Sequence, residues 1–289
     1  MSSLSLASPA PGPTLSDMQP SASSNGPYSG DPPAVPSAAT PTPSLGHPLP
    51  PLLDRTDSIT MPCGYHCRWA RPGDEDAIAT IYFGAFTGCQ IRMHCFPETG
   101  PESSARHWWK SEAHHWLMHE QLYYVHVVED ASTGNVIAFC KWSYHPNGYK
   151  ISEQPQHDGP SLPEINPRLA EHFFSQMGVE RERIHSTTPH IILSMLSVDG
   201  KHQGKRLAGV LLSWGITQAD KLGLPIYLES TTMGYPVYQK RGFQKIGSIM
   251  FDQTSQTDPA DDVRNFEHWS KQNLVVMIRS PNCVKAGNQ

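Results

Sequence analysis

Between residues 65 and 120, the pattern of apolar positions predicts one strand followed by two helices. The segment 65–69 predicts a short strand. Over 75–86, apolar side chains recur every three or four residues, as on one face of an amphipathic helix, and Asp74 is placed to serve as its N-cap. A second helical pattern covers 102–120 and contains three tryptophans and several histidines.

The next part of the chain predicts a hairpin, a loop and a further helix. The segments 122–129 and 135–144 are rich in strand-forming residues and flank a Ser-Thr-Gly-Asn turn signal, which favours an antiparallel hairpin. Residues 145–166 carry the prolines, glycines and polar residues typical of a loop insertion, and 167–178 has a helical pattern. The charged run that begins at Arg181 is expected at a solvated helix end or loop.

The clearest pattern follows this insertion. His190–Val198 is a continuous apolar run of the kind found in fully buried strands. After a polar loop at 199–206, a helix begins at Leu207 and ends at Gly223, a glycine in a C-cap position, and a second apolar strand covers 225–230. A strand, a helix and a strand in this order form a βαβ unit, so the two strands are expected to be parallel.

A short helix and two late strands complete the predicted fold. The helix covers 235–240 and stops at Gly242, and the strands cover 243–251 and 273–279. Together, the elements predict a mixed α/β domain whose central mixed sheet has about six to seven strands flanked by helices.

The first 60 residues differ from the rest in composition. They hold 13 of the 27 prolines and 12 serines, and the first 53 residues carry only two charged side chains, Asp17 and Asp31. Such a segment cannot bury enough apolar surface to offset the entropy of ordering it. We therefore expect a disordered Pro/Ser-rich tail over 1–60 and one domain over 61–289, with an insertion around 145–188.

Charge and cysteine content narrow the classes of function. The chain has 22 basic and 27 acidic side chains, a formal charge of −5, which argues against a nucleic-acid footprint. It has no apolar run of the length that a membrane span needs and no leader pattern, so we expect a cytoplasmic protein, with a nuclear location left open. The six cysteines lack the Cys-x2-Cys spacing of a zinc knuckle, and we expect neither a metal site nor a disulfide framework.

The loop from Gln203 to Ala208 carries the candidate chemistry. It leaves a buried strand and opens a helix, whose first N–H groups have no partners within the helix and lie at the positive end of its dipole. Such a turn can hold a phosphate or a pyrophosphate. Lys205 and Arg206 add formal positive charge at the same place.

The run Leu-Ser-Val-Asp-Gly-Lys-His-Gln-Gly-Lys-Arg-Leu-Ala, which starts at Leu196, resembles the acetyl-CoA motif of the GNAT superfamily of N-acetyltransferases. That motif has Gln/Arg-x-x-Gly-x-Gly/Ala after a strand. The later run Val-Tyr-Gln-Lys-Arg-Gly-Phe, from Val237, is similar to the Tyr-x-x-x-Gly-Phe signature of the same superfamily. Arg206 stands where the family usually has its first glycine, and we expect it in a helical conformation that needs no glycine.

The resemblance implies a GNAT-like acyl-CoA N-acyltransferase fold with acetyl-CoA as co-substrate and no metal. In this family the fourth and fifth strands splay apart and the pantetheine arm lies between them, so the Leu196 N–H would polarise the thioester carbonyl. Ser230 falls near a position that contacts the cofactor in relatives. The implied cofactor-binding residues are Leu196, Ser197, Val198, Gln203, Gly204, Lys205, Arg206, Leu207, Ala208 and Ser230.

Tyr238 matches the tyrosine of the signature and is the candidate general acid for the thiolate. Glu229 is a candidate general base that acts through water, or else a strand residue paired with a basic neighbour, because the position of the family's strand-four glutamate is Ile192 here. Ser194 and His190 are weaker candidates for the base. The histidine pair His115 and His119, and the tryptophans Trp108, Trp109 and Trp116, could line an acceptor pocket, and the tryptophans could equally be core.

Two functions remain open at this point. The first is direct acetyl transfer from acetyl-CoA to a primary amine, expected to be a small molecule, in a ternary complex. The alternative is a catalytically weak or inactive GNAT-fold protein that acts as an acetyl-CoA sensor or scaffold. The sequence does not define the oligomeric state.

Overall fold

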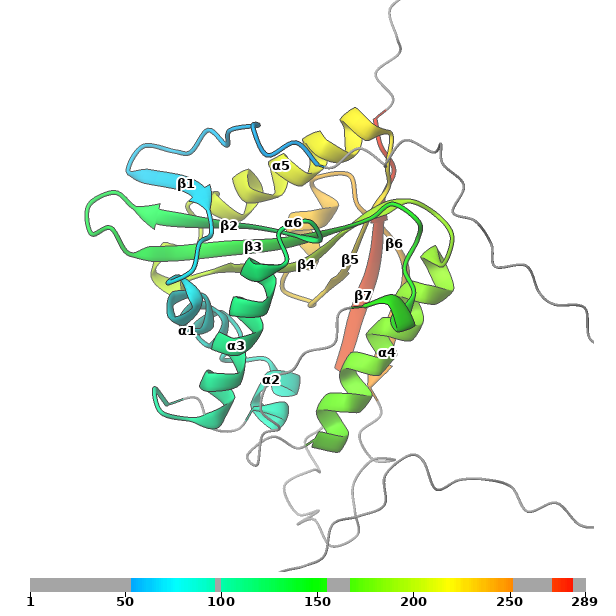
Figure 1. Cartoon of the computed structure of the whole chain (residues 1–289), viewed down its shortest axis with the longest axis horizontal. Coiled ribbons are helices and arrows are strands. Elements are labelled where there is room, and N and C mark those ends of the chain that lie inside the picture. The colour runs from blue at the N-terminus through cyan, green and yellow to red at the C-terminus, as the bar shows by residue number, and fades with distance from the viewer. Residues whose placement is uncertain (1–52, 97–99, 155–166, 252–271, 283–289) are drawn as a thin grey trace, which may run out of the picture. The chain divides into compact units, whose positions relative to one another are not determined.

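A seven-stranded open sheet forms the centre of the domain in the computed structural model (Figure 1). The structure describes residues 53–96, 100–154, 167–251 and 272–282, so most of the predicted tail lies outside the described residues. The strand order is β1-β2-β3-β4-β5-β7-β6, and only β4 and β5 pair in parallel, as the βαβ pattern predicts. The strands are β1 Tyr65–Trp69, β2 Tyr123–Asp130, β3 Val136–His145, β4 His190–Val198, β5 Ile226–Ser230, β6 Gln244–Phe251 and β7 Gln272–Arg279.

Helices cover both faces of this sheet. The predicted helices are confirmed with small changes at their ends, α4 extends seven residues beyond the predicted 178, and the short α2 was not predicted. Two short 3₁₀ helices, Ile151–Glu153 and Gly200–His202, lie in the loops. The α-helices are α1 Glu75–Ala85, α2 Gln90–Cys95, α3 Ser104–Met118, α4 Pro167–His185, α5 Leu207–Leu222 and α6 Tyr235–Gln239.

The sheet separates two apolar cores because successive side chains of a strand point to opposite faces. On β3, Phe139 belongs to the core shared with α1 and α3, whereas Cys140 and Trp142 belong to the core under α5. The helix α5 comes close to the sheet at Gly215, where an added Cβ would lie 2.4 Å from the Trp142 ring. The indole therefore occupies the space that a side chain at 215 would need.

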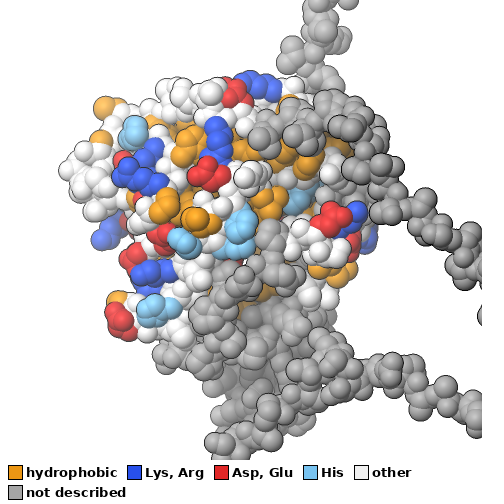
Figure 2. Space-filling model, viewed as in Figure 1, with side chains coloured by type: hydrophobic (Ala, Val, Ile, Leu, Met, Phe, Trp, Pro, Cys, Tyr) orange, Lys and Arg blue, Asp and Glu red, His pale blue; other side chains and the backbone are white. Residues whose placement is uncertain are grey.

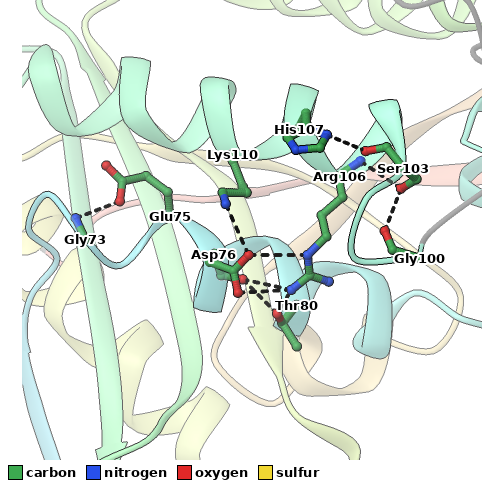
Figure 3. A network of polar contacts seen from close by, with 9 residues as sticks. All are labelled: Gly73, Glu75, Asp76, Thr80, Gly100, Ser103, Arg106, His107 and Lys110. Carbon is green, nitrogen blue, oxygen red and sulfur yellow. Dashed lines mark hydrogen bonds and ion pairs between the residues drawn. The ribbon is translucent and has the colours of Figure 1, made fainter.

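Two neighbouring helices, α1 and α3, are joined by a polar network (Figure 3). The Asp76 carboxylate accepts from the Arg106 guanidinium at 3.2 Å and pairs with Lys110 Nζ at 3.4 Å. Ser103 caps α3 by accepting from the Arg106 N–H at 3.2 Å. Asp74, the predicted cap of α1, makes no such bond, because its carboxylate accepts instead from the Arg68 guanidinium and the Arg71 N–H.

The segment that precedes β1 packs on the domain, so the predicted tail boundary at residue 60 lies too far along the chain. Leu53 is only 3% exposed and contributes to the core under α5. The Arg55 guanidinium lies 4.5 Å from the centre of the Trp69 ring. Asp57 pairs with Lys221 of α5 at 2.6 Å.

The surface carries both signs of charge. On the face shown in Figure 2, basic and acidic side chains are interspersed among apolar and histidine side chains. Within the described ranges, no helix has the length and apolar character needed to cross a bilayer.

Replacing Gly215 by alanine should destabilise the domain by roughly 1–3 kcal/mol, because the new methyl group must displace the buried Trp142 ring. Chemical denaturation measures the change in unfolding free energy. Gly84→Ala is the matched control, since it lies exposed in α1 with open space around its Cβ and should stabilise by up to about 1 kcal/mol. Equal effects of the two substitutions would contradict the close approach of α5 to β3.

His126 makes stability depend on pH. It is 3% exposed and its ring lies 3.8 Å from the Trp69 ring, and burial lowers its pKa to about 3. The unfolded chain, with a histidine pKa of about 6.5, therefore takes up the proton first as the pH falls, and the native state loses stability from about pH 6.5 downwards at up to ~1.4 kcal/mol per pH unit.

We expect His126→Leu to reduce this slope by up to ~1.4 kcal/mol per pH unit between about pH 6 and 4. Burial lowers the pKa of His145 and of His190 as well, so these two residues keep the rest of the slope. The measurement is denaturation as a function of pH. Val127→Ala, at the next residue of β2, serves as the control: it removes buried apolar atoms but no titratable group, so it should lower stability and leave the slope unchanged. A His126→Leu variant with the wild-type slope would show that His126 is protonated equally in both states.

Candidate functional site

The parallel pairing of β4 with β5 ends half-way along β4. Ile191–Leu193 pair with Ile226–Leu228, and no residue of β4 beyond Leu193 pairs with β5 in the described sheet. At the same level β4 carries a bulge, because Lys141 of β3 lies opposite Met195 while Trp142 lies opposite Leu193, which leaves Ser194 as the extra residue.

The bulge changes which backbone groups face the open side of β4. Before it, the Ile191 N–H donates to the Pro225 carbonyl on the β5 side. After it, the Asp199 N–H donates to the Ile137 carbonyl on the β3 side. Because N–H directions alternate along a strand, the Leu196 and Val198 N–H groups point away from β3, toward the side that β5 leaves unpaired.

The residues beside these amides are held by side-chain contacts. The Gln203 side chain donates to the Val198 carbonyl at 3.2 Å, so this predicted pyrophosphate residue also ties the loop to the end of β4. Ser197 is 3% exposed, and its hydroxyl has no hydrogen-bond partner among the described residues.

The loop before α5 exposes the start of a sixteen-residue helix. Gly204 and Arg206 both have positive φ, 76° and 65°, and Arg206 occupies the N-cap position without a side-chain capping bond. Lys205 and Arg206 are exposed, whereas Leu207 is buried and Ala208 half-buried in the core, so these last two can offer only backbone N–H groups to a ligand. The unsatisfied amides at the positive end of the helix suit an anion.

The expectation that Arg206 is helical is wrong. It is the one non-glycine with a positive φ in the described ranges, in a left-handed conformation that costs a residue with a Cβ about 1–2 kcal/mol. A glycine at this position would take the same conformation without that strain.

Arg241 adds a further positive charge that sequence reasoning missed. An added Cβ on Gly209, in the first turn of α5, would lie 2.6 Å from an Arg241 guanidinium nitrogen, so the guanidinium rests against that turn. The only signal in the sequence was its place within the Tyr-x-x-x-Gly-Phe signature. Arg241 and the two loop cations together make the start of α5 strongly electropositive.

Tyr238 lies on α6, half-buried against Phe243, with 5.8 Å between ring centres. Burial raises the pKa of its phenol, which therefore carries its proton at neutral pH, as a general acid must. Ser230, another predicted site residue, is buried, and its hydroxyl donates to the Thr231 carbonyl at 2.7 Å.

The sequence left two possible roles for Glu229, a general base acting through water or a strand residue paired with a basic neighbour. The structure shows the second. Its side chain is 4% exposed, and its two oxygens accept from Nε and a terminal nitrogen of Arg181 at 2.7 and 2.8 Å. Arg181 is thus a half-buried partner from α4, and the expectation of a solvated charged run is wrong for this residue. A carboxylate held on both oxygens is poorly placed to activate a water.

Known proteins resemble this chain in sequence over part of its length and in fold. No family model matches the sequence. A curated relative, the probable acyltransferase SID5 of Ajellomyces capsulatus, is 32% identical over 94 residues, and this match covers 32% of the chain and 62% of the relative's length. The chain therefore spans less than two thirds of that protein.

Two solved structures share the fold. The mosquito arylalkylamine N-acetyltransferase like 5b has a TM-score of 0.51 at 13% identity, and arylalkylamine N-acetyltransferase 2 from Aedes aegypti has a TM-score of 0.51 at 12% identity. Each match covers 75% of this chain and 99% of the other. The chain has the GNAT acetyltransferase fold.

In this GNAT fold, the candidate tryptophans and His190 are buried or, like Trp108, packed against the core. Trp109 and Trp116 are each 4% exposed, and Trp109 stacks on Tyr82 at 3.6 Å between ring centres. His190 is fully buried, and its Nδ1 lies 2.7 Å from the Thr188 carbonyl oxygen. An amine substrate could not reach a fully buried ring. Among the described residues, no three His, Cys, Asp or Glu side chains are grouped to hold a metal ion, and His115 and His119 lie as a pair with ring centres 4.2 Å apart.

Lys141 is the second residue, after Arg241, that the sequence did not point to. It lies in the middle of β3 beside the bulge of β4 and is half-buried, with Nζ 4.1 Å from the centre of the Trp116 ring. Nothing in the local sequence distinguishes it from an exposed strand lysine.

Arg206→Gly should stabilise the protein by about 0.5–1 kcal/mol, because the relief of the left-handed strain exceeds the added freedom of the unfolded chain. Chemical denaturation tests this. Arg206→Ala removes the same guanidinium but keeps a Cβ at positive φ, so it should give no gain. If both variants gained equally, charge rather than backbone strain would be the cause.

Proposed function

We propose that the chain is an acyltransferase that moves an acetyl group from acetyl-CoA to the amine of a small molecule. The observation that carries the proposal is the open edge of β4, with the Leu196 and Val198 N–H groups facing it, next to the uncapped and electropositive start of α5. An extended amide-containing arm that ends in a pyrophosphate fits both features, since the first needs backbone partners and the second needs an anion-binding helix start.

The chain's own residues supply the steps of transfer. Holding the thioester beside the bulge places its carbonyl near the outward Leu196 N–H, which stabilises the negative charge that develops on oxygen. The acceptor nitrogen attacks the carbonyl carbon, the C–N bond forms, and the C–S bond breaks. The Tyr238 phenol donates its proton to the leaving thiolate and regains one from the new amide nitrogen through solvent.

The amine class of the acceptor is supported by the fold alone. Two of the solved structures with this fold are named arylalkylamine N-acetyltransferases, and the sequence relative is named a probable acyltransferase. A screen that follows release of free thiol from acetyl-CoA, over arylalkylamines, aminosugars, polyamines, amino acids and peptides, identifies the acceptor. Failure of every class to release thiol would overturn the enzymatic proposal.

Acetyl-CoA binding without transfer is a second candidate, and two observations favour it. Arg206 takes a strained conformation in the phosphate loop, and Glu229 is tied up by Arg181. A sensor or scaffold of this kind would gain thermal stability from acetyl-CoA and release no thiol with any amine in the screen. A protein that acetyl-CoA does not stabilise would exclude both candidates.

Tyr238→Phe should lower kcat by about 100-fold or more, because the thiolate then leaves without a proton donor, while the Kd for acetyl-CoA stays near the wild-type value. Steady-state kinetics and calorimetric titration separate the two quantities. Tyr235→Phe, on the same short helix, is the matched control and should keep wild-type kinetics. Unchanged turnover in Tyr238→Phe would remove the phenol from the mechanism.

A further inference from the structure

Solvent reaches the middle of the sheet at one place, where neighbouring positions of β3, β4 and β5 are only half-buried. In the ten-residue strand β3, only Val136 at its start and Lys141 in its middle are not fully buried. The neighbouring strand β4 is only half-buried over residues 194–196. On β5 the residue Glu229 is half-buried too, and since its side chain is only 4% exposed, solvent reaches its backbone. Lys141 lies opposite Met195, and Glu229 directly follows the last residue paired with β4. These positions are therefore neighbours across three strands and mark an opening onto the sheet.

Lys141 projects from the face opposite α5. Side chains two apart on a strand share a face, and Phe139 belongs to the core under α1 and α3. The phosphate loop belongs to the other face, with α5. A thioester that passes between β4 and β5 would therefore have the phosphate loop on one side and Lys141 on the other, where an acceptor must approach.

The Lys141 amine is held between two aromatic rings and has no carboxylate paired with it among the described residues. Nζ lies 4.1 Å from the centre of the Trp116 ring and 4.3 Å from that of Tyr123. It makes no hydrogen bond and no ion pair within the described ranges. Burial lowers the pKa of Lys141 to about 7, with Arg181 acting in the same direction and Glu112 opposing them. In an appreciable fraction of the molecules, the Lys141 amine is thus neutral at physiological pH.

The groups packed around Lys141 explain why its pKa is lowered. Ser194 and Met195 of the bulge are uncharged, and α1 presents apolar residues and the buried Tyr82. Glu112 accepts from the Trp116 indole N–H at 3.1 Å. The titratable and charged side chains that face this part of β3 are Glu112 and His115 from α3, Tyr123 from β2, Arg181 from α4, Tyr149 after β3, and His145 on β3 itself.

We propose that Lys141 is the general base of the transfer reaction and takes the proton from the acceptor ammonium at the mid-sheet opening. The inference rests on the proposed function and assigns the proton-accepting role that Glu229 cannot fill while it is paired with Arg181. Neutral Nζ accepts one proton from R–NH3⁺, and the resulting R–NH2 attacks the thioester carbonyl carbon. The proton that the acceptor nitrogen loses after attack balances the one given to the thiolate. The ammonium of Lys141, held against the Trp116 and Tyr123 rings, then releases its proton to solvent.

Lys141→Arg separates a base from a structural cation. Arginine keeps a positive charge between the two rings but is not deprotonated in proteins. For the wild type we expect kcat/KM to rise with pH and level off above about pH 7, in line with the pKa of Lys141. Lys141→Arg and Lys141→Met should both lose about 100-fold at pH 7.5, with rates that keep rising to higher pH, and both should bind acetyl-CoA as the wild type does. Rescue of the rate by arginine would overturn the proposal.

Chemical labelling tests the same claim without turnover. Acetic anhydride acylates only neutral amines, so the labelling of each lysine as a function of pH, read by mass spectrometry, reports its pKa. Lys141 should reach half-maximal labelling near pH 7, and exposed Lys150, whose pKa its partner Glu153 raises, only at high pH. If Lys141 titrates with Lys150, it is not the base. If Lys141 titrates near pH 7 but no amine releases thiol, the proposed function fails instead.

Discussion

The early end of the pairing between β4 and β5 is the constraint on which the site depends. Three residue pairs hold the two strands together, and then the Ser194 bulge turns the next free N–H groups toward the unpaired side. In an intact parallel sheet these amides would be used up by β5. The early end of the pairing therefore leaves the opening, and the bulge sets Leu196 and Val198 as the residues whose N–H groups line it.

The sheet also separates two kinds of chemistry. The face under α5 carries the phosphate loop and the cations Lys205, Arg206 and Arg241, where charge is exposed and suits an anionic ligand. The opposite face carries Lys141 and the Arg181–Glu229 pair, where charge is partly or fully removed from water. A group held between the strands would contact both environments, which is what transfer between an anionic donor and an amine acceptor requires.

Much of the fold could be predicted from local pattern. The continuous apolar run of β4, the periodicity of α5 and the left-handed Gly223 at its end were all predicted, because each depends on neighbouring residues only. The short α2 has no room for a periodic pattern. The last turns of α4 contain the charged run from Arg181, and such a run is as typical of a solvated loop as of a helix.

The chemistry of the site was predicted less well, because it depends on contacts distant in sequence. Arg181 meets Glu229 across 48 residues, and only the register of β3 against β4 brings Lys141 to the bulge. The conformation of Arg206 was mispredicted for a different reason: the loop geometry, rather than the helix that follows, sets its backbone angles.

Amide hydrogen exchange with and without acetyl-CoA tests most directly whether the open edge of β4 binds the donor. Bound donor should slow exchange at residues 194–198 and in the first turn of α5, and should leave the antiparallel pair of strands β1 and β2 unchanged. Protection that appears elsewhere, or no protection at saturating acetyl-CoA, would contradict the assignment of this edge as the binding site.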